Sequence, residues 1–508
     1  MVIYVLESYT SKAEDVSLIF AIEFLSAFPL PSESGKAEGT RKELDLNFSL
    51  KSAGRILLLL LLFFIICVSI SEAGLKENVF ETVLPNGLKV ILLENHKAPL
   101  VTFQLWYRVG SRNEAWGKTG LSHMLEHMMF KGTEKVGPEE FSRIVQENGG
   151  NDNAFTSRDY TAYFENISAD RVQVSIDLES DRMRNLLLRE QDFWTERMVV
   201  MEERRLRTED SPQANLQEHM EATAFLTSPY HWPTIGWKED IERFTLEDLK
   251  AYYRMYYNPV NAILIVVGDF KREELLPKIE KAFGSIPKGI APNQERDIDP
   301  KQTGERRVFV KKEAQLPYIV MGYHVPNLRE PDSYALEVIA SLLSSGKSSR
   351  LYQSLVREKR LVLSEDADQS LLSRDPSLFY LSAEPLPGKE VAEVEKALDQ
   401  EVERLKKELV GTHELEKAKN QIEASFIFSQ DSLFSQAMLL AQHEIALTWR
   451  AIDDYLPSIR KVSPEDIQGV ARKYLIPDNR TVGILIPLPP KEGTLPAAGG
   501  PTKEHVVR

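Results

Sequence analysis

Alternating runs of apolar and polar residues divide this chain into short strands and amphipathic helices. Strand-like segments at 80–83 and 88–93 flank Pro85-Asn86-Gly87, a pattern typical of a β-hairpin. Further strands are predicted at 101–106, 153–157, 161–167 and 262–267, with helical patterns between them. Residues 287–304 are rich in proline, glycine and charge, which predicts a linker between two domains.

The two halves of the chain repeat one pattern. Residues 243–270 can be shifted onto 461–488 without a gap. Identical residues then coincide at Glu247/Glu465, Asp248/Asp466, Arg254/Arg472, Tyr256/Tyr474, Pro259/Pro477 and Asn261/Asn479. The repeat predicts an α+β fold of two similar α/β-sandwich domains related by duplication, each with an antiparallel-rich sheet packed by helices. We expect a leader over 1–73, an N-terminal domain over 74–287, a linker over 288–304, a C-terminal domain over 305–488 and a disordered tail over 489–508.

The leader has the features of a secretory signal. Lys51 and Arg55 precede an unbroken apolar run at 56–68, and small residues stand at Ser71 and Ala73. This order predicts cleavage after Ala73 and a periplasmic or secreted protein, with an uncleaved membrane anchor as the alternative. The net charge of −14 argues against nucleic acid as a partner. The single cysteine lies inside the apolar run, which excludes a disulfide framework.

The segment His123-Met124-Leu125-Glu126-His127 carries the clearest chemical signal. Two histidines four residues apart share one face of a helix, so both can bind one metal ion. Glu126 lies beside that face, where it could take a proton from a water molecule. A solvated helix face is the alternative, but the surrounding residues are apolar, and buried polar groups need partners.

A third ligand is expected from a second helix over 195–207. Its spacing places Glu196, Val199, Val200 and Glu203 on one inward face and turns Glu202 away from it. A solvated acidic helix remains the alternative for Glu202, and for Glu203 taken alone.

These motifs resemble the pitrilysin/insulinase family of zinc peptidases. The histidine motif is followed by FKGT at 130–133 and, after 75 intervening residues, by a glutamate. Further matching segments are GGNDNAFTSRDYTAY at 149–163, ESDRM at 179–183, ERMVVMEE at 196–203 and YYNPVNAILIVVGD at 256–269. The likeness runs from about residue 80 to 488 and is greatest to the shorter branch, which contains the mitochondrial processing peptidase β subunit and bacterial relatives.

The resemblance implies roles for particular residues. His123, His127 and Glu203 would bind one Zn²⁺ per chain, Glu126 would be the general base, and Glu196 would support the ligands. The strand at 153–157 would pair with substrate, through Asn153, Ala154 and Phe155. The expected function is a zinc-dependent endopeptidase acting on peptides or unfolded segments, with a non-catalytic assembly subunit as the alternative.

One segment departs from the family pattern R-E-K-x-G-L-A-Y. The chain reads Arg357-Glu358-Lys359-Arg360-Leu361-Val362-Leu363-Ser364, which keeps the arginine and lacks the tyrosine. Arg357 is therefore expected to contact substrate. Two domains would form half of a clam-shaped chamber, so we expect a homologous partner that carries the Arg/Tyr pair, with a homodimer as the alternative.

Overall fold

The computed structural model describes residues 78–293 and 299–489. The predicted leader and signal lie outside these residues, as does the predicted tail from residue 490 onward. Within the described ranges, no helix is both long enough and apolar enough to cross a membrane.

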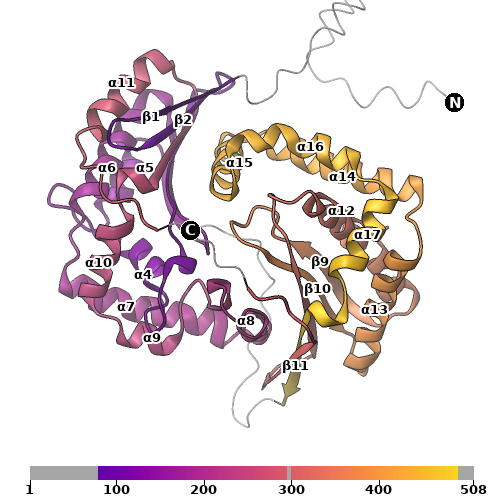
Figure 1. The fold of residues 1–508 in the computed structure, drawn as a ribbon. Helices are drawn as coiled ribbons and strands as arrows, with labels where there is room; N and C mark the ends of the chain where they lie inside the picture. The colour runs from indigo at the N-terminus through magenta and orange to yellow at the C-terminus, as the bar shows by residue number, and fades with distance from the viewer. Residues whose placement is uncertain (1–77, 294–298, 490–508) are drawn as a thin grey trace, which may run out of the picture. The chain divides into compact units, whose positions relative to one another are not determined.

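The first sheet has six strands in the order β1-β2-β6-β3-β5-β4. β1 and β2 lie side by side at one edge of this sheet (Figure 1). The strands are β1 (Val79–Val83), β2 (Lys89–Glu94), β3 (Leu100–Tyr107), β4 (Asn151–Thr156), β5 (Thr161–Ser168) and β6 (Ala262–Gly268). β2 and β6 are parallel, and the other neighbours are antiparallel. The hairpin predicted around Pro85-Asn86-Gly87 is confirmed, and Gly87 supplies the left-handed turn residue with φ of 91°.

Helices cover one face of this sheet with a continuous apolar core. They are α4 (Leu121–Met128), α6 (Val172–Asn185), α7 (Glu190–Arg204), α10 (Leu246–Tyr256) and α11 (Arg272–Phe283). α5 (Glu140–Glu147) packs on α6 through Phe141 and Val145. A short helix, α9 (Lys238–Arg243), precedes α10.

The second sheet has five strands in the order β7-β11-β8-β10-β9. The strands are β7 (Arg306–Glu313), β8 (Tyr318–Val325), β9 (Val362–Gln369), β10 (Ser377–Pro385) and β11 (Arg480–Leu488). Its helical layer consists of α12 (Asp332–Ser344), α13 (Val391–Lys407), α14 (Thr412–Ser429), α16 (Ile452–Lys461) and α17 (Pro464–Tyr474). β7 and β11 are parallel, as β2 and β6 are in the first sheet.

The structure confirms two similar α/β domains related by duplication. α10 and α17 begin and end at positions that the sequence shift superimposes, and β6 and β11 begin at superimposed positions. Thr245 and Ser463 each form a capping box with the aspartate three residues later. The Asn261 side chain donates to the Tyr256 carbonyl at 2.9 Å, and Asn479 donates to Tyr474 at 2.8 Å. The repeated residues are therefore those that end the helix and start the strand.

Each domain lends one helix to the other domain's sheet. α15 (Leu433–Ala446) packs Leu440 and Ile445 against Ile263 and Ile265 of the first sheet. α8 (Pro212–Ala224) packs Leu216 and Met220 against the second sheet. This exchange covers a face of each sheet that would otherwise expose apolar residues. The predicted domain boundaries stay a prediction, because these cores are shared across them.

Candidate metal centre

The helix α4 is held at its N-terminus by a buried carboxylate. Gly120 precedes the helix in a left-handed conformation with φ of 91°, and it offers no side chain as a cap. Instead, the Glu114 carboxylate accepts hydrogen bonds from the backbone N–H groups of Gly120 and Ser122, each at 2.7 Å. Burial raises the pKa of Glu114 to about 8, against the opposing effect of these hydrogen bonds.

The apolar face of α4 fixes the direction of its polar residues. Leu121, Met124, Leu125 and Met128 are buried in the core of the first domain. The opposite side of the helix therefore carries the two histidines, with Glu126 beside them.

Three side chains from α4 and α7 converge. Oε2 of Glu203 lies 3.6 Å from Nε2 of His123 and 3.3 Å from Nε2 of His127. One nitrogen or oxygen atom from each of the three residues lies within 4.8 Å of the others. His123 is buried, with 8% of its surface exposed. The arrangement brings two nitrogens and one carboxylate oxygen to a single point.

Two of these groups, His123 and Glu203, have charge states that suit a divalent cation. Burial lowers the pKa of His123 to about 3, so its ring is neutral at physiological pH. Burial also opposes the charged form of Glu203, but a hydrogen bond with His127 and nearby positive charges lower its pKa to about 2. Two imidazoles and one carboxylate are the ligands of many catalytic zinc sites. The residues present therefore fit a zinc ion.

Glu196, seven residues before Glu203 on α7, orients His127. Its Oε1 lies 2.9 Å from Nδ1 of His127, and its Oε2 lies 2.5 Å from Nζ of Lys131. Burial disfavours the charged form of Glu196, but these two hydrogen bonds lower its pKa below the usual value. Burial disfavours the charged form of His127 too, yet hydrogen bonds with Glu196 and Glu203 raise its pKa to about 9. A carboxylate on Nδ1 leaves Nε2 facing the other ligand atoms.

Glu126 is positioned from the neighbouring sheet. Its Oε2 accepts a hydrogen bond from the Thr156 hydroxyl at the end of β4. Burial raises the pKa of Glu126, while this hydrogen bond and the charge of His127 oppose the rise. A raised carboxyl pKa brings a proton acceptor closer to neutral pH.

The expected inward face of α7 is correct except for one residue. Glu196 and Val200 are buried and Glu203 points to the histidines, whereas Val199 is 46% exposed because it lies at the margin of that face. Glu202 turns outward and pairs with Arg205. The helix begins at Glu190, earlier than the sequence indicated.

The three predicted strand residues lie on β4, which has a neighbour on one side only among the described strands. Ala154 is buried in the core below α4, and Phe155 packs against Trp106 on the opposite face. The side-chain oxygen of Asn153 accepts a hydrogen bond from the N–H of Ala154. The free edge of β4 therefore ends at Thr156, beside the candidate base Glu126.

Arg357 lies apart from this cluster. It is exposed on η6 (Tyr352–Glu358), and no contact among the described residues joins it to the histidines. Nearby, Arg360 adopts φ of 49°, a left-handed conformation that favours glycine. Arg360 directly precedes Leu361, which stands at the glycine of the family pattern, and Ser364 stands at the position of its tyrosine.

Some residues of the site were not found by sequence reasoning. Thr156 holds Glu126, Lys131 holds Glu196, and Arg207 lies 2.8 Å from the second oxygen of Glu203. Two quoted motifs also meet, since the Thr133 hydroxyl donates to Asp181 at 2.5 Å. The sequence indicated these residues only by their position inside or beside the matching motifs. Their partners could not be predicted, because they depend on contacts between distant elements.

Two family profiles match most of this chain. The profile described as insulinase (peptidase family M16) matches residues 89–236, and the peptidase M16 inactive domain matches residues 243–422. The zinc protease PqqE of Helicobacter pylori is 36% identical over 413 residues, covering 80% of this chain and 92% of that protein. An uncharacterized zinc protease of Streptomyces coelicolor is 27% identical over 410 residues, covering 78% of this chain and 87% of that protein.

A solved structure shows the same fold. The crystal structure of a protease from Helicobacter pylori aligns with a TM-score of 0.76 and 35% sequence identity. The alignment covers 80% of this chain and 99% of that one. Similarity of this extent, together with the two matched profiles, shows that the chain belongs to the pitrilysin/insulinase family of peptidases, family M16.

Proposed function

We propose that this chain is a zinc-dependent endopeptidase that cleaves peptides or unfolded segments. The observation that carries the proposal is the convergence of His123, His127 and Glu203, with Glu126 held beside them by Thr156. His123, His127 and Glu203 would bind one zinc ion, with Glu196 supporting His127.

The chain's own residues supply proton transfer and substrate alignment. A bound zinc ion would polarise the scissile carbonyl and lower the pKa of a water molecule. Glu126 accepts the proton of the attacking water and then delivers it to the leaving amine. The Thr156 hydroxyl holds the carboxylate of Glu126 in place for both transfers.

Substrate would bind as an added strand. The free edge of β4 offers backbone groups to an extended peptide, which suits recognition that tolerates many sequences. Asn153, Ala154 and Phe155 would lie along that peptide, and Arg357 would contact it only if a further chain or a domain movement brought the two together.

A homologous partner subunit would complete the substrate chamber. The missing tyrosine beside Arg357 favours a heterodimer with a chain that carries the Arg/Tyr pair, and a homodimer is the alternative. Full activity of the purified chain alone, unchanged when a homologous subunit is added, would exclude the heterodimer. Cleavage of the predicted signal after Ala73 would place the protein in the periplasm or outside the cell, and an uncleaved signal would anchor it to the membrane.

The alternative is a non-catalytic assembly subunit of the same family. The match of the second domain to an inactive M16 domain is compatible with it. The pairing of a buried, neutral His123 with Glu203 favours the enzyme over the assembly subunit. A subunit with no catalytic role does not require such a pair.

The variant Glu126→Gln tests the proposal. It keeps the size of the side chain and its hydrogen bond with Thr156 but cannot accept a proton. Hydrolysis of a mixed peptide library should fall by about 10²-fold or more, while zinc content measured by atomic emission stays near that of the wild type.

The matched control is Glu202→Gln, an exposed glutamate on α7. It should keep both zinc and activity. Turnover of Glu126→Gln close to that of the wild type would remove Glu126 from the mechanism. A wild-type chain that binds zinc but cleaves no peptide, with or without a homologous subunit, would favour the assembly subunit.

A further inference from the structure

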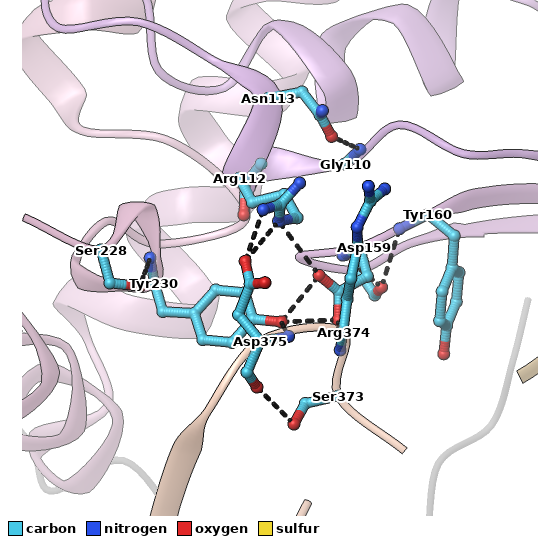
Figure 2. A network of polar contacts seen from close by, with 12 residues as sticks. Gly110, Arg112, Asn113, Asp159, Tyr160, Ser228, Tyr230, Ser373, Arg374 and Asp375 are labelled. Atoms are coloured by element: carbon cyan, nitrogen blue, oxygen red, sulfur yellow. Dashed lines mark hydrogen bonds and ion pairs between the residues drawn. The ribbon is translucent and has the colours of Figure 1, made fainter. Parts of the chain in front are cut away.

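A buried polar network joins the two domains (Figure 2). We call Arg112, Asp159, Tyr230 and Asp375 the interdomain network. Arg112, Asp159 and Tyr230 belong to the first domain, and Asp375 precedes β10 of the second. All four are buried, with exposures of 5%, 6%, 1% and 0%.

The network is bonded across the domain boundary at several atoms. The guanidinium group of Arg112 donates to Asp375, with Nε at 3.1 Å, and its Nε lies 3.5 Å from Asp159. The Tyr230 hydroxyl donates to Asp159 at 2.7 Å and accepts from the N–H of Asp375 at 3.2 Å. The N–H of Arg374 also donates to Asp159, at 3.0 Å.

On the first-domain side, the network is attached to the hairpin between β4 and β5. The N–H of Ser111 donates to the carbonyl of Ser157 at 3.1 Å, and the N–H of Arg112 donates to that of Arg158 at 3.0 Å. Gly110 fits this approach because a Cβ there would lie 2.3 Å from the Ser157 oxygen. Asp159 itself stands three residues after Thr156, which holds Glu126.

The same short segment also holds the histidine helix. Glu114, two residues after Arg112, accepts the N–H groups that begin α4. The indole N–H of Trp232 donates to the Ser111 carbonyl at 2.6 Å, which fixes the segment from a third side. Residues 110–114 therefore connect the second domain, the β4–β5 hairpin and the start of α4.

On the second-domain side, hydrogen bonds hold residues 373–375, the loop that leads into β10. The Asn327 side chain donates to the carbonyls of Ser373 and Arg374, at 2.9 and 2.7 Å. The Ser373 hydroxyl donates to the Asp375 carbonyl at 2.9 Å. Buried charges lose their hydration, so they must be paired and hydrogen-bonded at fixed positions. The interdomain network therefore fixes one orientation of Asp375 relative to Arg112, Asp159 and Tyr230.

We propose that Asp375 is a positioning residue: through Arg112, Asp159 and Tyr230, the second domain holds the β4–β5 hairpin and α4 in the relative placement that brings Thr156 to Glu126. This inference rests on the proposed function for its effect on turnover. It assigns to the second domain, which has no counterpart of the histidine pair in α12, a direct part in ordering the centre.

Two variants test the proposal. Asp375→Asn keeps the shape of the side chain and removes its charge, and Tyr230→Phe removes only the bridging hydroxyl. Each should lower kcat for peptide hydrolysis about tenfold or more while KM changes less than twofold and zinc content is unchanged. Should Asp375→Asn fail to fold, Tyr230→Phe decides the question alone.

Hydrogen exchange, measured without substrate, supplies a readout that is independent of catalysis. In both variants, backbone amides of residues 111–122 and 156–161 should exchange at least tenfold faster, while amides of β6 and β11 stay protected. The matched control is Tyr455→Phe, which loses a partly buried hydrogen bond from the hydroxyl to Glu337 inside the second domain. This variant should change neither the exchange of those segments nor kcat.

The outcomes separate the two hypotheses. Faster exchange in these segments with unchanged kcat would overturn the positioning role, as would unchanged exchange in Tyr230→Phe. If the wild type cleaves no peptide, the proposed function fails, and the exchange measurement still shows whether the network orders the hairpin and α4.

Discussion

At the scale of single residues, the neighbouring glutamates Glu202 and Glu203 have different surroundings because their side chains point from different sides of α7. The side chain of Glu203 is 18% exposed and faces the two histidines, whereas that of Glu202 is 57% exposed and pairs with Arg205. An exposed ion pair of this kind contributes little to stability. The helix period therefore turns Glu203 toward the histidines and Glu202 toward solvent.

Glu203→Gln and Glu202→Gln form a matched pair for zinc binding. Glu203→Gln replaces a charged oxygen ligand with a neutral amide, so zinc per chain after dialysis should fall from about one to near zero. Glu202→Gln should retain its zinc. Metal analysis of both purified variants checks this, and the reverse result would move the third ligand to Glu202.

A second glutamate predicts a pH effect on stability. Burial, together with the nearby charge of Asp366, raises the pKa of Glu365 on β9 to about 8. The folded chain then holds a proton that the unfolded chain releases above its ordinary pKa of 4.5. The contribution of Glu365 to the free energy of unfolding therefore falls as the pH rises from about 4.5 to about 8.

The variant Glu365→Gln removes this contribution. We compare the free energy of unfolding of the variant with that of the wild type at each pH. The difference should favour the variant by about 1 kcal/mol or more at pH 9 compared with pH 5. Urea unfolding at both pH values measures the difference. A stability difference that is independent of pH would show that Glu365 titrates normally.

At the scale of elements, the duplication predicts equal behaviour of two helix starts. Thr245 of α10 and Ser463 of α17 occupy superimposed positions and form the same capping box. Replacing either with alanine leaves a backbone N–H without its side-chain acceptor. Thr245→Ala and Ser463→Ala should each cost about 1 kcal/mol of unfolding free energy.

The control for these variants is Thr223→Ala. The Thr223 hydroxyl donates to the His219 carbonyl inside α8 and caps nothing, so its loss should be neutral within about 0.5 kcal/mol. Thermal unfolding of the three variants makes the comparison. A large cost at only one of the two caps would show that the repeated helices are not equivalent in energy.

At the scale of the whole molecule, the exchanged helices make the domains depend on each other. The second sheet has its open face covered by α8 of the first domain, and the first sheet is covered by α15 of the second. Either domain alone would expose a large apolar surface, which promotes aggregation.

The chain cut between residues 293 and 299 tests this dependence. Fragments 78–293 and 299–489 should be insoluble when produced separately, and should copurify as a soluble complex when produced together. Size-exclusion chromatography after coexpression is the measurement. A soluble, cooperatively unfolding fragment 299–489 would show that α8 is dispensable for the second domain.

Local pattern was enough to predict much of the fold and of the centre. The hairpin at Pro85-Asn86-Gly87, the helix of His123 and His127, and the repeated helix–strand unit each follow from residues close together in sequence. Hydrophobic period and turn residues act at that range. The family resemblance then selected Glu203, which its spacing alone left open.

What the tertiary structure alone decided are the contacts between distant segments. Thr156 reaches Glu126, α8 and α15 exchange sheets, and Arg112 meets Asp375 across 263 positions of sequence. No local period encodes such pairs, because any exposed arginine and aspartate carry the same sequence signal. Burial then selects among them, since a charge removed from water requires a partner at a fixed place.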